Sequence, residues 1–154
     1  MKPFQKQTNA RLHAVQALYA FEVNPEADTR LIYQFLHHEV GQSVVQEDEN
    51  GRETEIALDD FDAALFTQLV KTAQEEQFTT MLQAALSDHW HKNYIDPILK
   101  AIIRTGLAEA WLHPETDAAV LINEYTDLAH AFYDGPEVGL VNAVLHKAIE
   151  QMRS

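Results

Sequence analysis

Apolar residues recur at three- and four-residue spacing along almost the whole chain, which is the period of amphipathic α-helices. Breaks in the pattern coincide with residues that end helices. Asn24-Pro25 and His113-Pro114 end two predicted helices, because the residue before proline avoids the helical conformation. No alternation typical of strands competes with this pattern in the helical stretches. The sequence therefore predicts an all-α fold, a bundle of about six or seven helices with short connections.

Local signals place the boundaries of the first three predicted helices. The first begins near Thr8 or Asn9, since either side chain can accept a hydrogen bond as an N-cap. A second helix is predicted over about 28–40. The helical pattern resumes after Asp59 or Asp60, and we expect the third helix to start there.

The clearest helix start in the chain is Asp96-Pro97. Aspartate is a strong N-cap, and proline costs nothing at the first helical position, where the backbone N–H has no partner in any case. The face that follows contains Gly106, which would let another helix approach closely. The next helix is predicted to start at about 116–117, and the last one after Gly135.

The segment at about 42–57 interrupts the helical pattern and is rich in aspartate and glutamate. Its weak periodicity favours a solvated acidic loop. The Asn50-Gly51 pair also suits a tight turn, so a small hairpin flanked by 44–45 and Ile56 is the alternative.

The composition fits one globular domain over residues 1–154, with 46% hydrophobic and 23% charged residues. The absence of cysteine excludes disulfides and thiolate metal sites. The sequence shows neither a signal peptide nor an apolar stretch of membrane-spanning length, so we expect a cytoplasmic protein. The formal net charge of −13 argues against indiscriminate binding to nucleic acid.

The histidines do not have the spacing that metal binding requires. His37-His38 are adjacent and His89 and His91 are one residue apart, so on a helix each pair points to different faces. A zinc-binding pair on a helix is instead spaced by four residues. The sequence also contains no glycine-rich phosphate loop, nucleophile elbow or paired-carboxylate motif. We expect no catalytic residue, metal or cofactor, and a protein that acts by binding and is not an enzyme.

Four phrases of the sequence resemble those of a known family and occur in its order. The family's first-helix signature is similar to residues 14–19 (AVQALY), and its central helix to residues 96–104 (DPILKAIIR). The next two family helices are similar to residues 121–129 (LINEYTDLA) and 141–147 (VNAVLHK). Over almost its whole length apart from the acidic segment, the chain resembles the NusB family of transcription antitermination factors.

The resemblance implies a helical fold of two packed subdomains, each with three to four helices. It also implies an RNA-binding partner of NusE, a protein of the small ribosomal subunit, that recognises the boxA element of ribosomal RNA leader transcripts. The assembly joins an elongating RNA polymerase complex and suppresses termination. A homodimer lies within the range of assemblies known for the family.

Basic and polar residues near the N-terminus are the candidate RNA contacts. Lys2, Lys6 and Arg11 precede the first acidic residue, so this segment is locally basic. The alternative is a solvated terminus that contacts no RNA. By resemblance, Gln16 would hydrogen-bond a base edge and Tyr19 would stack on an unpaired base. Tyr19 also lies on the apolar stripe of the first helix, and packing in the core is its simpler role.

The last predicted helix departs from the family pattern. The family has a polar-basic-aromatic run before Val-Asn, where this chain has Gly139 and Leu140, which supply neither charge nor a stacking surface. Asn142 is still a polar candidate for RNA contact. By the same resemblance, Glu75 and Glu76 would face the basic protein NusE, although a solvated helix face explains them equally well.

Two hypotheses for function follow. The first is a divergent antitermination factor of the NusB type, a non-enzymatic adaptor that binds NusE and leader RNA. The second is a protein-interaction module on the same fold that has lost RNA recognition. The few basic residues, the charge of −13 and Leu140 in place of an aromatic residue suggest the second hypothesis.

Overall fold

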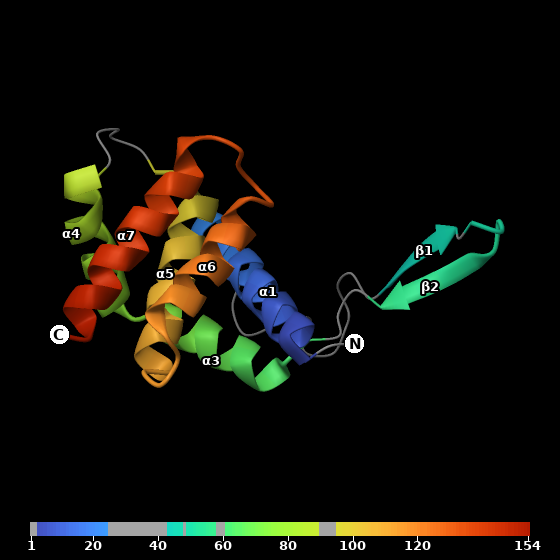
Figure 1. Cartoon of the computed structure of the whole chain (residues 1–154), viewed down its shortest axis with the longest axis horizontal. Coiled ribbons are helices and arrows are strands. Elements are labelled where there is room, and N and C mark those ends of the chain that lie inside the picture. The colour runs from blue at the N-terminus through green and yellow to red at the C-terminus, as the bar shows by residue number, and fades with distance from the viewer. Residues whose placement is uncertain (1–2, 25–42, 48, 58–60, 90–94) are drawn as a thin grey trace.

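The computed structural model describes residues 3–24, 43–47, 49–57, 61–89 and 95–154. The described residues contain six helices and one two-stranded hairpin (Figure 1). The helices are α1 (Pro3–Val23), α3 (Ala63–Ala73), α4 (Glu76–His89), α5 (Pro97–Leu112), α6 (Ala118–Ala129) and α7 (Pro136–Met152). The predicted all-α class is confirmed, while the helix predicted over 28–40 lies outside the described residues. None of the described helices is long and apolar enough to cross a membrane.

Helix α5 is the centre of the bundle and packs against α1, α3, α4, α6 and α7. Its sequence is apolar on nearly every side, so its buried residues face several neighbours at once. Figure 1 shows the other helices arranged around it. The central position explains why Ile103 and Thr105 are both fully buried although they lie on nearly opposite sides of the helix.

The buried apolar side chains form two clusters. The smaller one lies between α1 and α3 and consists of Ala10, Ala14, Ala17, Leu65, Phe66, Leu69 and Val70. The larger one joins α4, α5, α6 and α7, with Val15 and Leu18 contributed by α1. Helix α3 contributes Ala73 to the larger cluster as well, so α1 and α3 take part in both clusters.

Aspartate side chains start three of the helices. Asp96 accepts a hydrogen bond from the backbone N–H of Ile98 at 2.9 Å, with Pro97 as the first helical residue, as predicted. Asp117 caps α6 in the same way, through the backbone N–H of Ala119 at 3.2 Å. The starts of α5 and α6 are therefore predicted correctly from sequence.

Two predicted helix starts were wrong. Helix α3 begins after Asp62 and not after Asp59 or Asp60, because the Asp62 carboxylate accepts the backbone N–H of Leu65 at 3.0 Å. Helix α1 begins at Pro3, so that Thr8 and Asn9 lie inside the helix and do not cap it. Proline favours the first turn, and this signal outweighs that of the two polar residues.

The acidic segment forms a hairpin and not the expected loop. Strand β1 (Ser43–Glu47) pairs antiparallel with β2 (Glu53–Ala57), in a register that places Val44 opposite Ile56. Gly51 in the connection has a φ of 76°, which a residue without a side chain adopts readily. The preference of the Asn50-Gly51 pair for tight turns was thus the sequence signal that indicated the hairpin. Figure 1 shows the hairpin extending away from the helices.

Gly106 allows the close approach of helices that the sequence predicted. A Cβ atom added there would lie 3.0 Å from Cδ2 of Leu145 on α7 and 3.3 Å from Cδ2 of Tyr125 on α6. Both neighbours are fully buried and have little room to move. The glycine therefore sets the spacing between α5 and these two helices.

We expect Gly106→Val to lower the free energy of unfolding by roughly 1–3 kcal/mol, because it forces a branched side chain into a filled site. Urea denaturation followed by circular dichroism measures the change. Gly139→Ala is the matched control, since a Cβ atom there meets nothing within 4 Å. The control should gain about 0.5–1 kcal/mol from the higher helix propensity of alanine. Equal stability of the two variants would contradict the close packing at Gly106.

Candidate functional site

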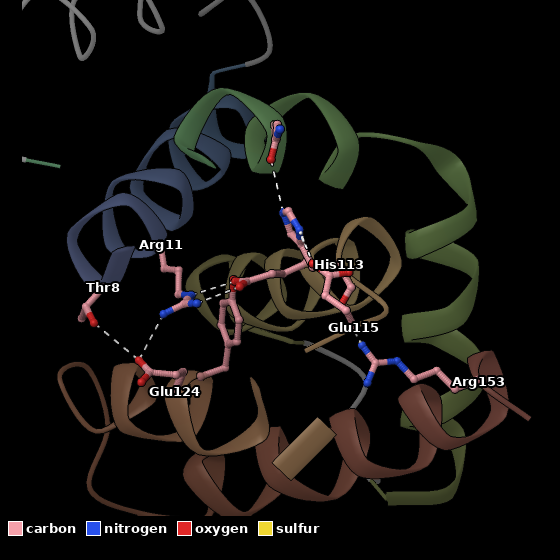
Figure 2. A network of polar contacts seen from close by, with 9 residues as sticks. Thr8, Arg11, His113, Glu115, Glu124 and Arg153 are labelled. Carbon is pink, nitrogen blue, oxygen red and sulfur yellow. Dashed lines mark hydrogen bonds and ion pairs between the residues drawn. The ribbon is translucent and has the colours of Figure 1, made fainter. Parts of the chain in front are cut away.

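A buried charged cluster joins α1, α5 and α6 (Figure 2). The Arg11 side chain on α1 is only 7% exposed and meets the Glu109 carboxylate on α5 side by side. Arg11 Nε donates to Glu109 Oε1 at 2.8 Å, and Arg11 Nη2 donates to Glu109 Oε2 at 2.7 Å. This bidentate arrangement gives the strongest hydrogen bonding between a guanidinium and a carboxylate.

Helix α6 completes the cluster with two residues. Tyr125 donates its hydroxyl hydrogen to Glu109 Oε1 at 2.7 Å, so the buried carboxylate accepts three hydrogen bonds. Glu124 Oε2 accepts from Arg11 Nη1 at 3.3 Å and from the Thr8 hydroxyl at 3.5 Å. The cluster therefore joins three helices through polar side-chain atoms that nearly all have a hydrogen-bond partner.

The surroundings of Arg11 and Tyr125 keep the protonation states of these two groups constant. Burial alone would lower the pKa of Arg11, but the hydrogen bonds and charge of Glu109 outweigh it and raise the pKa of the guanidinium. Burial, together with the charge of Glu109, raises the pKa of the Tyr125 hydroxyl well above its usual value. Arg11 stays charged and Tyr125 stays neutral over the physiological pH range.

The expectation that Arg11 contacts RNA does not fit this placement. Its guanidinium faces inward and is engaged by two carboxylates, so little of it is left for a phosphate. Periodicity alone does not reveal this role, because Arg11 and its partner Glu109 are 98 positions apart in the sequence. The signal was a carboxylate on the apolar face of α5, which a folded protein tolerates only beside a cation.

Other predicted RNA contacts lie on the outer side of α1. Lys6 and Gln16 are exposed, and Gln16 Oε1 lies 3.2 Å from Nδ1 of the buried His13. Tyr19 is 37% exposed, so the expected role in the core is wrong. Gln16 and Tyr19 are three residues apart and thus share one face of the helix. Lys2 lies outside the described residues.

The remaining candidates lie elsewhere on the molecule. Asn142 is exposed on α7, which packs on α4, α5 and α6. Leu140 is buried in the core, where an aliphatic side chain packs well. Glu75 and Glu76 are exposed at the junction of α3 and α4, where the Gln77 side chain donates to Glu75 Oε1 at 2.7 Å. Asn142, Glu75 and Glu76 therefore lie outside α1.

We expect Arg11→Met to lower the free energy of unfolding by roughly 3–5 kcal/mol, because it leaves Glu109 buried without its cation. Adding Glu109→Gln should recover part of the loss, since the amide oxygen still accepts the Tyr125 hydrogen bond. Chemical denaturation of the single and double variants measures both effects.

The matched control is the exposed ion pair between Lys100 and Glu22, which has the same length of 2.7 Å. Lys100→Met should cost less than about 1 kcal/mol, because water screens this pair. A loss for Arg11→Met as small as that of the control would show that the buried cluster does not hold the helices together.

Comparison with known proteins identifies the family. The model of the NusB family matches residues 8–150. The transcription antitermination protein NusB of Granulibacter bethesdensis is 34% identical over 149 residues, covering 95% of this chain and 88% of the relative. The proteins of the same name from Rhizobium johnstonii and Rhodospirillum rubrum are 34% and 35% identical, covering 94% of this chain and 86% and 83% of the relatives.

These relatives are named as transcription antitermination factors and not as enzymes, which agrees with the class expected from the sequence. The four matching phrases, the helical fold and the similarity along nearly the full chain lead to one conclusion. The chain belongs to the NusB family.

Proposed function

We propose that this protein is a transcription antitermination factor, a non-enzymatic adaptor that binds boxA-type leader RNA together with NusE and supports transcription of ribosomal RNA. The observation that carries the proposal is membership of a family whose members bear this name. The exposed polar and aromatic face of α1 supports RNA contact. RNA polymerase would be reached indirectly, through the other members of the assembly.

The proposed RNA surface relies on bases more than on phosphates. Tyr19 offers a ring for stacking, worth roughly 1–3 kcal/mol per base, and Gln16 offers an amide for a base edge. Lys6, with Lys2 before it, supplies the positive charge, and Asn142 is a further polar candidate. With Arg11 turned inward and a net charge of −13, this surface alone attracts RNA weakly. The basic partner NusE would supply the missing cations.

The proposed protein surface is the acidic pair at the start of α4. Glu75 and Glu76 are exposed, and their charge complements a basic ribosomal protein. Carboxylates repel RNA phosphates, so the same pair would keep the nucleic acid on the other side of the adaptor.

The alternative function is a protein-interaction module that has lost RNA recognition. Two features of the structure favour it: the Arg11 guanidinium is occupied within the protein, and Leu140 is buried and offers no ring to a base. Under this alternative NusE still binds, while RNA binding is absent with or without it.

We expect fluorescence anisotropy of a labelled boxA-like RNA to show tight binding only when NusE is present. Tyr19→Ala should weaken that binding about tenfold, because the variant lacks the aromatic ring on which a base would stack. Lys6→Ala should weaken it less and reduce its dependence on salt concentration.

Lys71→Ala is the matched control for charge, since Lys71 is an exposed cation on α3. It should leave RNA binding unchanged. Captured NusE without any RNA binding would establish the alternative function. If the unmodified protein binds neither RNA nor NusE, both hypotheses are rejected.

A further inference from the structure

Two adjoining pockets lie where α5 and α7 end. The first, of about 450 Å³, is lined by Ala110, Trp111, Pro114, Met152 and Arg153. The second, of about 480 Å³, lies against α6 and α7, and Arg153 and Glu150 are among its lining residues. Because Arg153 borders both, we call them together the C-terminal pockets. Each has a volume typical of sites that take a side chain or a small molecule.

Trp111 makes the first pocket unusual for a protein surface. The residue is 51% exposed, and its ring contacts the buried Phe78 ring edge-on, with 6.5 Å between centroids. The indole is therefore held in place on one side and open to solvent on the other. A fixed, exposed tryptophan beside an apolar pocket is typical of the residues that dominate binding to protein partners.

Arg153 lines both pockets, and its guanidinium is hydrogen-bonded to backbone carbonyls. Its Nη1 donates to the carbonyl of Thr116 at 2.7 Å, and its Nη2 donates to the carbonyls of Ala110 and His113, both at 3.2 Å. These carbonyls belong to the end of α5 and the turn that follows it. Arg153 thus shapes the first pocket, whose other lining side chains are apolar.

Carboxylates flank the C-terminal pockets. Glu115 follows Pro114 directly, and its side chain is 70% exposed. Glu150 lines the second pocket, and its side chain is 74% exposed. Each carboxylate has a histidine nearby: His113 Nδ1 lies 3.2 Å from Glu115, and His146 Nδ1 lies 3.8 Å from Glu150. Glu115 and Glu150 thus place two carboxylates at the rim beside one guanidinium, that of Arg153, whose Nη atoms already donate to backbone carbonyls.

We propose that the C-terminal pockets dock a basic polypeptide segment, which inserts one apolar side chain beside Trp111 and places lysine or arginine side chains against Glu115 and Glu150. The apolar lining suits the anchor, and the two carboxylates complement the flanking cations. RNA is disfavoured here, because its phosphates would meet the same carboxylates. A second copy of the chain is disfavoured as well, since each copy has a net charge of −13.

The location allows this segment and the proposed RNA to bind at the same time. Helix α1, which carries Lys6, begins at one end of the bundle, and α7 ends at the other (Figure 1). An adaptor with contacts at both ends can join two partners without competition between them. The inference holds whether or not RNA is bound, because it depends on none of the residues proposed to contact RNA.

The test uses the full chain and a set of labelled synthetic peptides. Each peptide has one leucine, methionine or phenylalanine anchor flanked by lysines, and a matching set has glutamates in place of the lysines. Fluorescence anisotropy of the peptide measures the affinity. The chain has two tryptophans, so Trp90→Phe leaves Trp111 as the sole source of tryptophan emission and reports where the peptide binds.

We expect at least one lysine peptide to bind saturably and to shift the emission of Trp111 to shorter wavelength. Trp111→Ala should weaken binding tenfold or more. The double variant Glu115→Gln, Glu150→Gln should remove the preference for lysine over glutamate peptides without altering the packing around Trp111. Val120→Ala is the control, because Val120 is also 51% exposed but does not line either pocket.

Three results would overturn the proposal. One is the absence of saturable binding by every lysine peptide. Another is equal affinity for lysine and glutamate peptides in the unmodified chain. The third is unchanged affinity in the Trp111→Ala variant, provided that circular dichroism shows the helices intact.

Discussion

The paired hydrogen bonds between Arg11 and Glu109 hold the first helix against the central one. Both charges are withdrawn from water, and either one would be costly if it were left alone in the core. Tyr125 and Glu124 join the pair from α6, so three helices share one charged cluster. The relative positions of these helices depend on this cluster, because the apolar contacts around it have no direction of their own.

This cluster also determines what α1 presents to solvent. With Arg11 turned inward, Gln16 and Tyr19 are on the exposed part of the helix, and few cations remain outside. The surface of the bundle is consequently acidic overall, and it attracts basic proteins more readily than nucleic acid. Such a surface suits the proposed adaptor, whose RNA contacts would be made together with a cationic partner. The exposed Trp111 at the other end adds an apolar anchor point to this acidic surface.

Much of the fold could be predicted because its signals are local. The caps Asp96 and Asp117 form hydrogen bonds to backbone groups two residues away, so residue type and spacing are sufficient to identify them. The start of α1 was missed because the polar residues Thr8 and Asn9 resemble caps when their surroundings are unknown. The hairpin depended on Gly51, whose φ of 76° is a local property, but the acidic composition favoured a loop.

The sequence by itself determined the helical class, most helix boundaries and the family, since these follow from periodicity, capping and ordered phrases. Only the tertiary structure decided that Arg11 is buried and that Tyr19 is exposed. Arg11 lies 98 and 113 positions from the residues that engage its guanidinium, so no local pattern reveals the pairing. Tyr19 shares a stripe with apolar residues, but periodicity cannot show where the neighbouring helices stop covering that stripe. Exposure is a property of the packed helices, and it turned a residue expected in the core into one on the surface.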